Sequence, residues 1–122
     1  MRKIVLSLAV AAILGVGAPA LAQTKGPNGG LISGEKGHAV ELIPGATEIT
    51  VYLLDDGKVE APKGATVRAV IQDGSKNESV TLTVDGNKLV GKLSAPLNKG
   101  ARVVISGKDG AGHTVQGRFV IP

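Results

Sequence analysis

Two histidines and one glutamate are the residues of this sequence best suited to hold a metal ion. His38 and Glu41 stand three positions apart at the start of an apolar run, and His113 lies far downstream. Two imidazoles and a carboxylate can hold Cu(II) or Zn(II) weakly. The sequence therefore singles out His38, Glu41 and His113 as candidate metal ligands, and it indicates no other cofactor.

The expected secondary structure limits how these residues can combine. On a helix the His-x-x-Glu spacing places both side chains on one face, whereas along a strand successive side chains alternate. In a strand His38 points with Val40, and Glu41 points with Ala39 to the opposite face. The two cannot share one ion unless the strand bulges or His38 lies outside it. The alternation therefore favours a strand-edge histidine that binds no metal, with the metal ligand as the other interpretation. His113 is expected at a sheet rim, where the two histidines could meet, although their spacing does not place them.

Catalytic patterns are missing from the sequence. A hydrolase triad needs a nucleophile, a base and an orienting acid, and only the two histidines could act as a histidine base. No Gly-x-Ser-x-Gly motif surrounds a serine, and the glycines of 26–30 precede strands rather than the helix that a phosphate-binding loop requires. The adjacent acids Asp55 and Asp56 are typical of a solvated turn. These patterns predict that the protein is not an enzyme.

Short strands are the elements that must position the candidate ligands. Aliphatic and β-branched residues alternate with polar ones, and turn residues interrupt them at intervals of about eight to twelve residues. Asp85-Gly86 predicts a hairpin with a type I′ turn, and Asp109-Gly110 predicts another hairpin. In the strand expected at 79–84, Val80, Leu82 and Val84 should point inward. The expected strands are 31–32, 38–43, 47–54, 65–71, 79–84, 88–93, 101–106 and 113–121.

The whole pattern predicts an all-β fold. No stretch after residue 22 shows apolar residues at helical spacing over a helical length. Seven or eight short strands predict a small antiparallel immunoglobulin-like β-sandwich, with a small β-barrel as the alternative. The core must be aliphatic, because Tyr52 and Phe119 are the only aromatic residues and the chain has no cysteine.

The first 22 residues have the features of a cleavable secretory signal peptide. Arg2 and Lys3 precede an apolar run, and Ala20-Leu21-Ala22 supplies a small-x-small cleavage pattern. Cleavage after Ala22 would leave no stable membrane anchor; an uncleaved anchor, the alternative, has an apolar run shorter than the roughly 20 residues of a span. We expect a signal peptide at 1–22, an extended glycine-rich lead-in at 23–30, one domain at 31–122, and a periplasmic location.

The charge balance argues against a nucleic-acid partner. The net charge of the whole chain is +4, with 14 basic and 10 acidic residues. Removal of the signal peptide takes Arg2 and Lys3 away, leaving 12 basic residues against the same 10 acidic ones. These charges are interspersed along the chain without a basic run, so the net positive charge is only weak evidence for a nucleic-acid or membrane partner.

Three short segments together resemble a known group of proteins. They are Gly-Pro-Asn-Gly-Gly at 26–30, Gly-His-Ala-Val-Glu-Leu at 37–42 and Val-Tyr-Leu-Leu-Asp-Asp-Gly-Lys at 51–58. In this order, over residues 26–60, they resemble small bacterial periplasmic proteins and the N-terminal segments of adaptor subunits of heavy-metal efflux pumps. That group often carries paired histidines before the Glu-Leu, and here Ala39 stands at the second position. The resemblance implies a periplasmic, non-enzymatic β-domain linked to metal handling.

Two functions follow as hypotheses. The first is an exported, non-enzymatic periplasmic accessory or binding protein, linked to heavy-metal handling and acting with a periplasmic protein partner. The second is a structural or protein-interaction domain that pairs with another chain through a sheet edge or through its N-terminal arm, residues 23–30.

Overall fold

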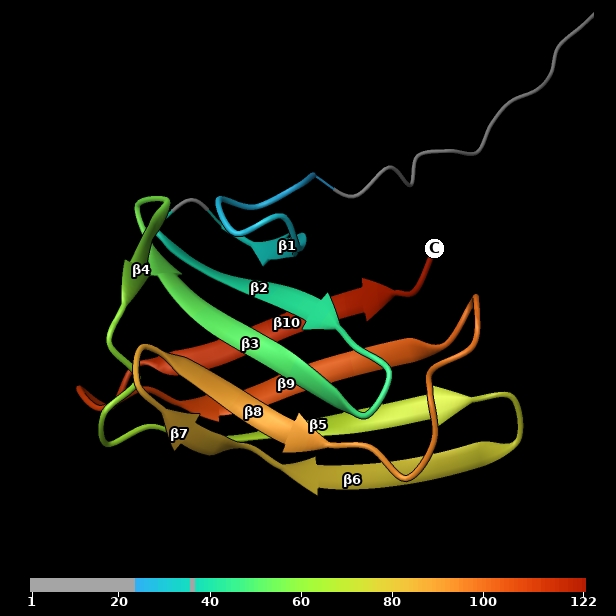
Figure 1. The fold of residues 1–122 in the computed structure, drawn as a ribbon. Coiled ribbons are helices and arrows are strands. Elements are labelled where there is room, and N and C mark those ends of the chain that lie inside the picture. Colours follow the sequence, from blue (N-terminus) through green and yellow to red (C-terminus); the bar gives the residue numbers. More distant parts are fainter. Residues whose placement is uncertain (1–23, 36) are drawn as a thin grey trace, which may run out of the picture.

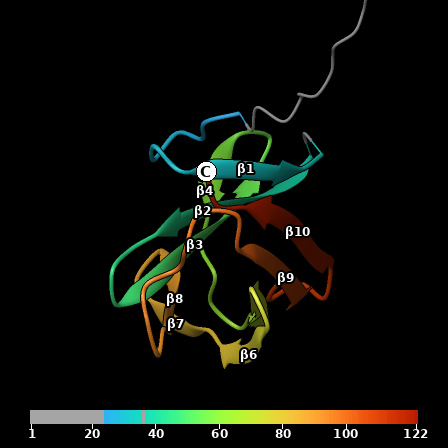
Figure 2. The same ribbon diagram turned by 90° about the vertical axis from the view of Figure 1, so that its right-hand side faces the viewer.

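The computed structural model describes residues 24–35 and 37–122, so the expected signal peptide lies outside the described residues. Two antiparallel sheets face each other, as the two ribbon views show (Figures 1 and 2). The strands are β1 (Leu31–Gly34), β2 (His38–Pro44), β3 (Glu48–Asp55), β4 (Lys58–Glu60), β5 (Thr66–Asp73), β6 (Lys76–Thr81), β7 (Thr83–Asp85), β8 (Lys88–Lys92), β9 (Arg102–Lys108) and β10 (Thr114–Val120).

The two sheets form a sandwich and do not close into a barrel. Sheet A has the strand order β1-β2-β3-β8-β7, with β4 paired to β3, and sheet B has the order β10-β9-β5-β6. The predicted all-β sandwich is therefore confirmed. Across residues 24–35 and 37–122, no helix is long and apolar enough to cross a membrane.

Residues 79–84, expected to form one strand, belong to two strands in different sheets. β6 ends at Thr81 in sheet B, and β7 begins at Thr83 in sheet A. Leu82 lies between them, and its N–H donates to the Val67 carbonyl of sheet B at 3.0 Å. Val84 points to the inner face of sheet A, like its buried cross-strand partner Leu89. It is nevertheless 41% exposed, because β7 is the edge strand of this sheet. This split, together with the three-residue β4, raises the strand count above the expected seven or eight.

Two tight turns differ in the number of residues with positive φ. At the turn between β3 and β4, Asp56 (φ 53°) and Gly57 (φ 81°) both have positive φ, which defines a type I′ turn. Between β7 and β8, only Gly86 (φ 66°) has positive φ, as in a type II′ turn. The predicted hairpin at Asp85-Gly86 is confirmed, but its predicted turn type is wrong.

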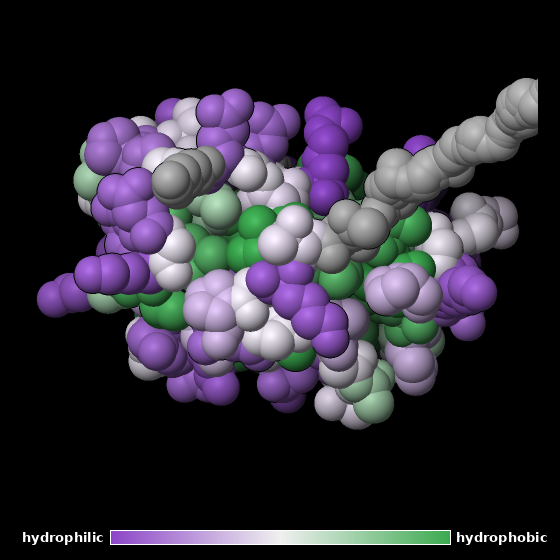
Figure 3. Space-filling view, turned by 90° about the horizontal axis from the view of Figure 1, so that it is seen from above, coloured by the Kyte–Doolittle hydropathy of each residue, from purple (hydrophilic) through white to green (hydrophobic). Residues whose placement is uncertain are grey.

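An aliphatic core fills the space between the sheets. Its members include side chains from both sheets that are fully buried: Leu42, Ile49, Val51, Leu89, Val103 and Ile105. Phe119 is the one aromatic residue in this core cluster, as the composition predicts. Hydrophilic side chains cover much of the surface seen from above, with hydrophobic surface showing between them (Figure 3).

The described part of the lead-in, residues 24–30, folds back on itself instead of running on in the expected extended conformation. The Gly26 N–H donates to the Gly30 carbonyl at 2.8 Å, and the Ile32 N–H donates to the Thr24 carbonyl at 2.9 Å. Lys25 forms an isolated antiparallel bridge with Leu31. The segment therefore forms a tight turn that lies against the start of sheet A.

Candidate metal centre

Three side chains with metal-binding atoms converge at one end of the sandwich. His38 begins β2, Glu60 ends β4, and Asp109 follows β9. One potential ligand atom from each lies within 4.8 Å of the other two. Within residues 24–35 and 37–122, this is the one group of three or more His, Asp and Glu residues with such spacing.

The ladder of sheet A places His38 and Glu60 on the face that looks toward sheet B. Leu53 of β3 pairs with Val40 on one side and with Glu60 on the other. Cross-strand partners share a face, so Glu60 lies on the inner face with the buried Val40 and Leu53. His38 precedes Val40 by two residues and therefore lies on this face too.

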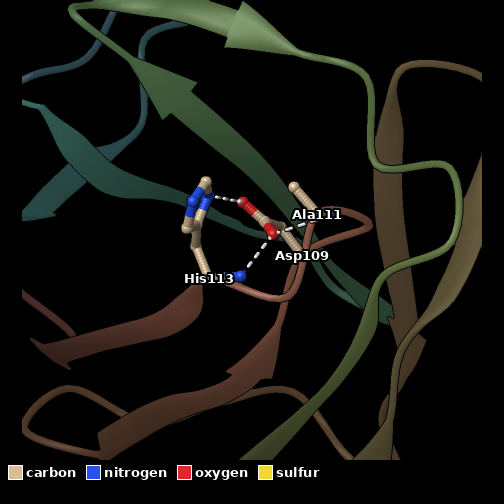
Figure 4. A network of polar contacts seen from close by, with 3 residues as sticks. All are labelled: Asp109, Ala111 and His113. Atoms are coloured by element: carbon tan, nitrogen blue, oxygen red, sulfur yellow. Dashed lines mark hydrogen bonds and ion pairs between the residues drawn. The ribbon is translucent and has the colours of Figure 1, made fainter.

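Asp109 reaches the same point from sheet B through the turn between β9 and β10. Its Oδ1 atom accepts hydrogen bonds from the N–H groups of Ala111 (3.0 Å) and His113 (2.8 Å). Figure 4 shows the carboxylate held in this turn and directed toward the imidazole of His113. The side chain of Asp109 is only 4% exposed, against 60% for His113. The turn therefore fixes one carboxylate oxygen and leaves Oδ2 directed at the histidine.

A close backbone contact holds this turn against the segment that follows Glu60. A Cβ atom at Gly110 would overlap the carbonyl oxygen of Lys63, so only glycine permits the approach. Pro62, next to Lys63, is fully buried. Glu60 and Asp109 are thus brought together by main-chain packing between two loops that lie far apart in the sequence.

His113 joins the group at its exposed side. Its ring centroid lies 5.2 Å from that of His38, with the two planes tilted by 44°. Its Nδ1 atom is 3.3 Å from Asp109 Oδ2. The two histidines, which their spacing alone could not place, therefore do meet at one end of the sandwich, with His113 in the loop just before β10.

Glu41 is separated from this group. His38 and Glu41 lie on opposite faces of β2, as the predicted alternation requires, and Glu41 is fully buried. Its Oε2 atom accepts hydrogen bonds from the N–H groups of Asn28 (2.9 Å) and Gly30 (2.7 Å). The Asn28 side-chain amide donates to its Oε1 at 2.9 Å. The structure thus gives the Glu41 carboxylate a partner in the lead-in, away from the histidines.

A small recess lies between the three converging side chains. It has a volume of about 20 Å³, and His38, Glu60 and Asp109 border it together with the apolar Val40 and Leu53. A space of this size is about large enough for one water molecule, and a single metal ion needs no more room. Ligand atoms around a tetrahedral zinc ion are about 3.4 Å apart, so a shift of roughly 1 Å per side chain would close the group on an ion.

Comparison with known proteins does not help to assign these residues. No protein-family profile, curated protein or solved structure matches the chain. The residues of the centre are therefore assigned from the geometry of this chain alone.

Two of the residues in the group were not among the sequence candidates. The sequence predicts Asp109 only as the start of a hairpin, and it does start one. Its position four residues before His113, across a glycine-rich turn, is a signal that points to it. Glu60 carries no such signal, because its position depends on β4, a strand of three residues.

The environment of Asp109 gives the fold a pH dependence. Burial alone raises the pKa of this carboxyl, but the N–H groups of His113 and Ala111 and the nearby imidazole outweigh burial and hold the pKa below its ordinary value of 3.8. The folded protein therefore binds this proton less readily than the unfolded chain. The stabilisation is complete above the unfolded pKa and is lost as the pH falls through the folded value.

We expect Asp109→Asn to lower the free energy of unfolding near neutral pH, and this deficit to shrink in acid. Urea unfolding of both proteins at about pH 7 and about pH 3 measures it, because the wild type loses the contribution of the carboxylate as that group is protonated. An equal deficit at both pH values would show that the ionised carboxylate contributes nothing to stability.

Proposed function

We propose that this chain is an exported, non-enzymatic binding protein that holds one divalent transition-metal ion between the two sheets. His38, Glu60 and Asp109 are the ligands, and His113 orients the Asp109 carboxylate. The observation that carries the proposal is the convergence of these three ligand atoms within 4.8 Å around a recess of about 20 Å³.

The donor set indicates the class of metal. One imidazole nitrogen and two carboxylate oxygens suit Zn(II) and Cu(II), whereas Mg²⁺ and Ca²⁺ prefer oxygen ligands alone. Three protein ligands leave a coordination position open, as in zinc sites that exchange a ligand. An open position suits an accessory protein that passes its ion to a protein partner. The signal peptide expected at 1–22 and the resemblance of 26–60 to efflux adaptors support a periplasmic role in heavy-metal handling.

Calorimetric titration of residues 23–122 with Zn(II) and with Cu(II) tests the proposal. We expect one ion per chain, and an affinity loss of about tenfold or more in His38→Gln and in Glu60→Gln, because each removes one of three ligands. Glu48→Gln is the matched control. Glu48 is a half-buried glutamate at the opposite end of β3, paired with Lys92.

Two results would contradict a metal site at this position. One is a wild-type chain that binds neither ion more tightly than about 1 mM. The other is a loss of affinity in Glu48→Gln as large as in Glu60→Gln, which would indicate nonspecific binding to surface carboxylates. Circular dichroism of each variant shows whether the fold is retained.

The alternative of strand addition through the N-terminal arm has less support. Asn28 and Gly30 are engaged with the buried Glu41, and Lys25 already bridges Leu31. Along the edge of sheet B at β10, the Arg118 N–H donates to the Ser33 hydroxyl of β1 at 2.8 Å. These contacts occupy backbone groups that an added strand would need.

A further inference from the structure

The outer face of sheet B gathers positive charge. All three arginines of the described residues lie on it: Arg68 on β5, Arg102 on β9 and Arg118 on β10. Lys108 at the end of β9 completes the set, and all four side chains are exposed. We call these four residues the cationic face.

The registers of the sheet give the dimensions of the cationic face. Lys108 and Arg102 stand six residues apart on β9, which is about 20 Å along the strand. Arg68 pairs with Ser106 on one side of β9, and Arg118 pairs with Val104 on the other. Two strand spacings separate β5 from β10, about 10 Å. Measured along the sheet, the four cations thus outline a diamond of about 20 by 10 Å.

Carboxylates do not neutralise this face. None of the outward-pointing residues of β5, β6, β9 and β10 is Asp or Glu, and no ion pair within the described residues involves any of the four cations. At its margins, Asp73 is bound by Asn98 and Glu78 by Ser94. Glu35 shares a separate hollow with Arg118 beyond the β10 edge.

The opposite sheet shows the contrast. On the outer face of sheet A, Lys92 of β8 pairs with Glu48 of β3, and Lys88 pairs with Asp85 across the β7–β8 hairpin. Positive and negative side chains alternate there, as on an ordinary solvated surface. The segregation of charge is therefore a property of sheet B.

A shallow hollow lies within the cationic face. It has a volume of about 660 Å³, and Arg68 and Lys108 stand at its border. The Arg68 guanidinium donates to the Ser79 hydroxyl at 2.8 Å, which leaves its charge without an anionic partner. Guanidinium, ammonium and hydroxyl groups are the usual donors to phosphate oxygens. Four hydroxyl side chains line the hollow: Thr66, Ser79, Thr81 and Ser106.

We propose that the cationic face docks on an anionic membrane surface, with lipid phosphates facing the four cations and one headgroup in the hollow. A face that carries four cations and no carboxylate is complementary in charge to a layer of lipid phosphates. Half-buried Val70 and Val104 pair with each other between the cations and offer small aliphatic groups at the depth of the headgroups. No aromatic residue lies on this face, so we expect attachment by charge, without deep insertion. The proposal is independent of the metal centre.

Sedimentation with vesicles tests this docking. We expect residues 23–122 to bind vesicles that contain phosphatidylglycerol at low salt and not to bind vesicles of pure phosphatidylcholine. The bound protein should dissociate as the salt concentration is raised. Each cation near an anionic surface contributes about fivefold to binding, so Arg68→Gln with Arg118→Gln should weaken it roughly 25-fold. The control is Lys88→Gln with Lys92→Gln, which removes the same charge from sheet A and should keep binding within about twofold.

Several outcomes would overturn the proposal. One is equal binding to anionic and neutral vesicles, or none to either. Another is an equal loss in the sheet A control, which would mean that only net charge matters. Suppression of vesicle binding by millimolar inorganic phosphate at constant ionic strength would identify a soluble phosphate as the ligand. Retention on heparin at salt concentrations that abolish vesicle binding would identify a soluble polyanion instead.

Discussion

Glu41→Ala is expected to lower the free energy of unfolding by about 3 kcal/mol or more. The Glu41 carboxylate is fully buried and accepts hydrogen bonds from two backbone N–H groups and one amide of the lead-in. Alanine would leave these donors without the carboxylate that now accepts from them, and the Gly30 N–H is buried, where a donor without a partner is costly. Urea unfolding of residues 23–122 measures the difference.

Two further variants sharpen this test. Glu41→Gln retains an acceptor oxygen and should cost less, about 1 kcal/mol. Gly26→Ala tests the same contact from the lead-in, because a Cβ atom at this position would overlap the Glu41 carboxyl group. We expect it to destabilise by less than Glu41→Ala, because the atoms that it meets end a side chain that can shift and keep some of its hydrogen bonds. A cost within about 0.5 kcal/mol of zero for both variants would refute the role of the lead-in.

The Glu41 variants also distinguish a structural role of the Glu41 carboxylate from a role as a metal ligand. If the carboxylate serves the lead-in alone, Glu41→Gln keeps the wild-type affinity for Zn(II) and Cu(II) in a calorimetric titration. A loss of affinity without loss of stability would instead restore Glu41 to the ligand set that the sequence suggested.

Gly107→Ala is the second substitution with a large expected effect, at about 3 kcal/mol of destabilisation or more. Gly107 of β9 pairs with Val67 of β5, and a Cβ atom there would overlap the Thr66 carbonyl oxygen and the Val67 Cα atom. Both are backbone atoms inside a ladder, so neither can move aside cheaply. Thermal or urea unfolding would show the loss.

Gly37→Ala is the matched control for this substitution. Among the described residues, no atom outside its immediate neighbours lies within 4 Å of a Cβ built at Gly37, so a methyl group meets no contact there. We expect its stability to remain within about 0.5 kcal/mol of the wild type. A Gly107 variant as stable as the Gly37 variant would show that β5 and β9 can separate locally to admit a methyl group.

Local alternation was enough to predict most of the fold. The period of two in segments such as 47–54 and 65–71 depends only on which side chains face the core, and both became strands. The same pattern could not show the break at Leu82, because Val80 and Leu82 remain apolar whichever sheet they join. β4 was also missed, since three residues are too few to show a period.

The residues of the candidate site show the same difference between what local alternation predicts and what long-range contacts determine. The opposite orientation of His38 and Glu41 follows from alternation within one strand, and it was predictable. Asp109 and Glu60 were not, because their meeting with His38 depends on the contact between Lys63 and Gly110. The burial of Glu41 depends likewise on a turn of glycines, whose backbone N–H groups carry no side-chain signal of their own.

The passage of the chain from sheet B to sheet A at Leu82 has a consequence for the compartment in which the domain can fold. Many small exported domains join their layers with disulfides, which require an oxidising environment. Here the main chain itself joins the layers at Leu82, the Ser33 hydroxyl links β1 to β10, and the protein contains no cysteine. Its folding is therefore indifferent to redox conditions, and the same sandwich should form in a reducing cytosol and in an oxidising compartment.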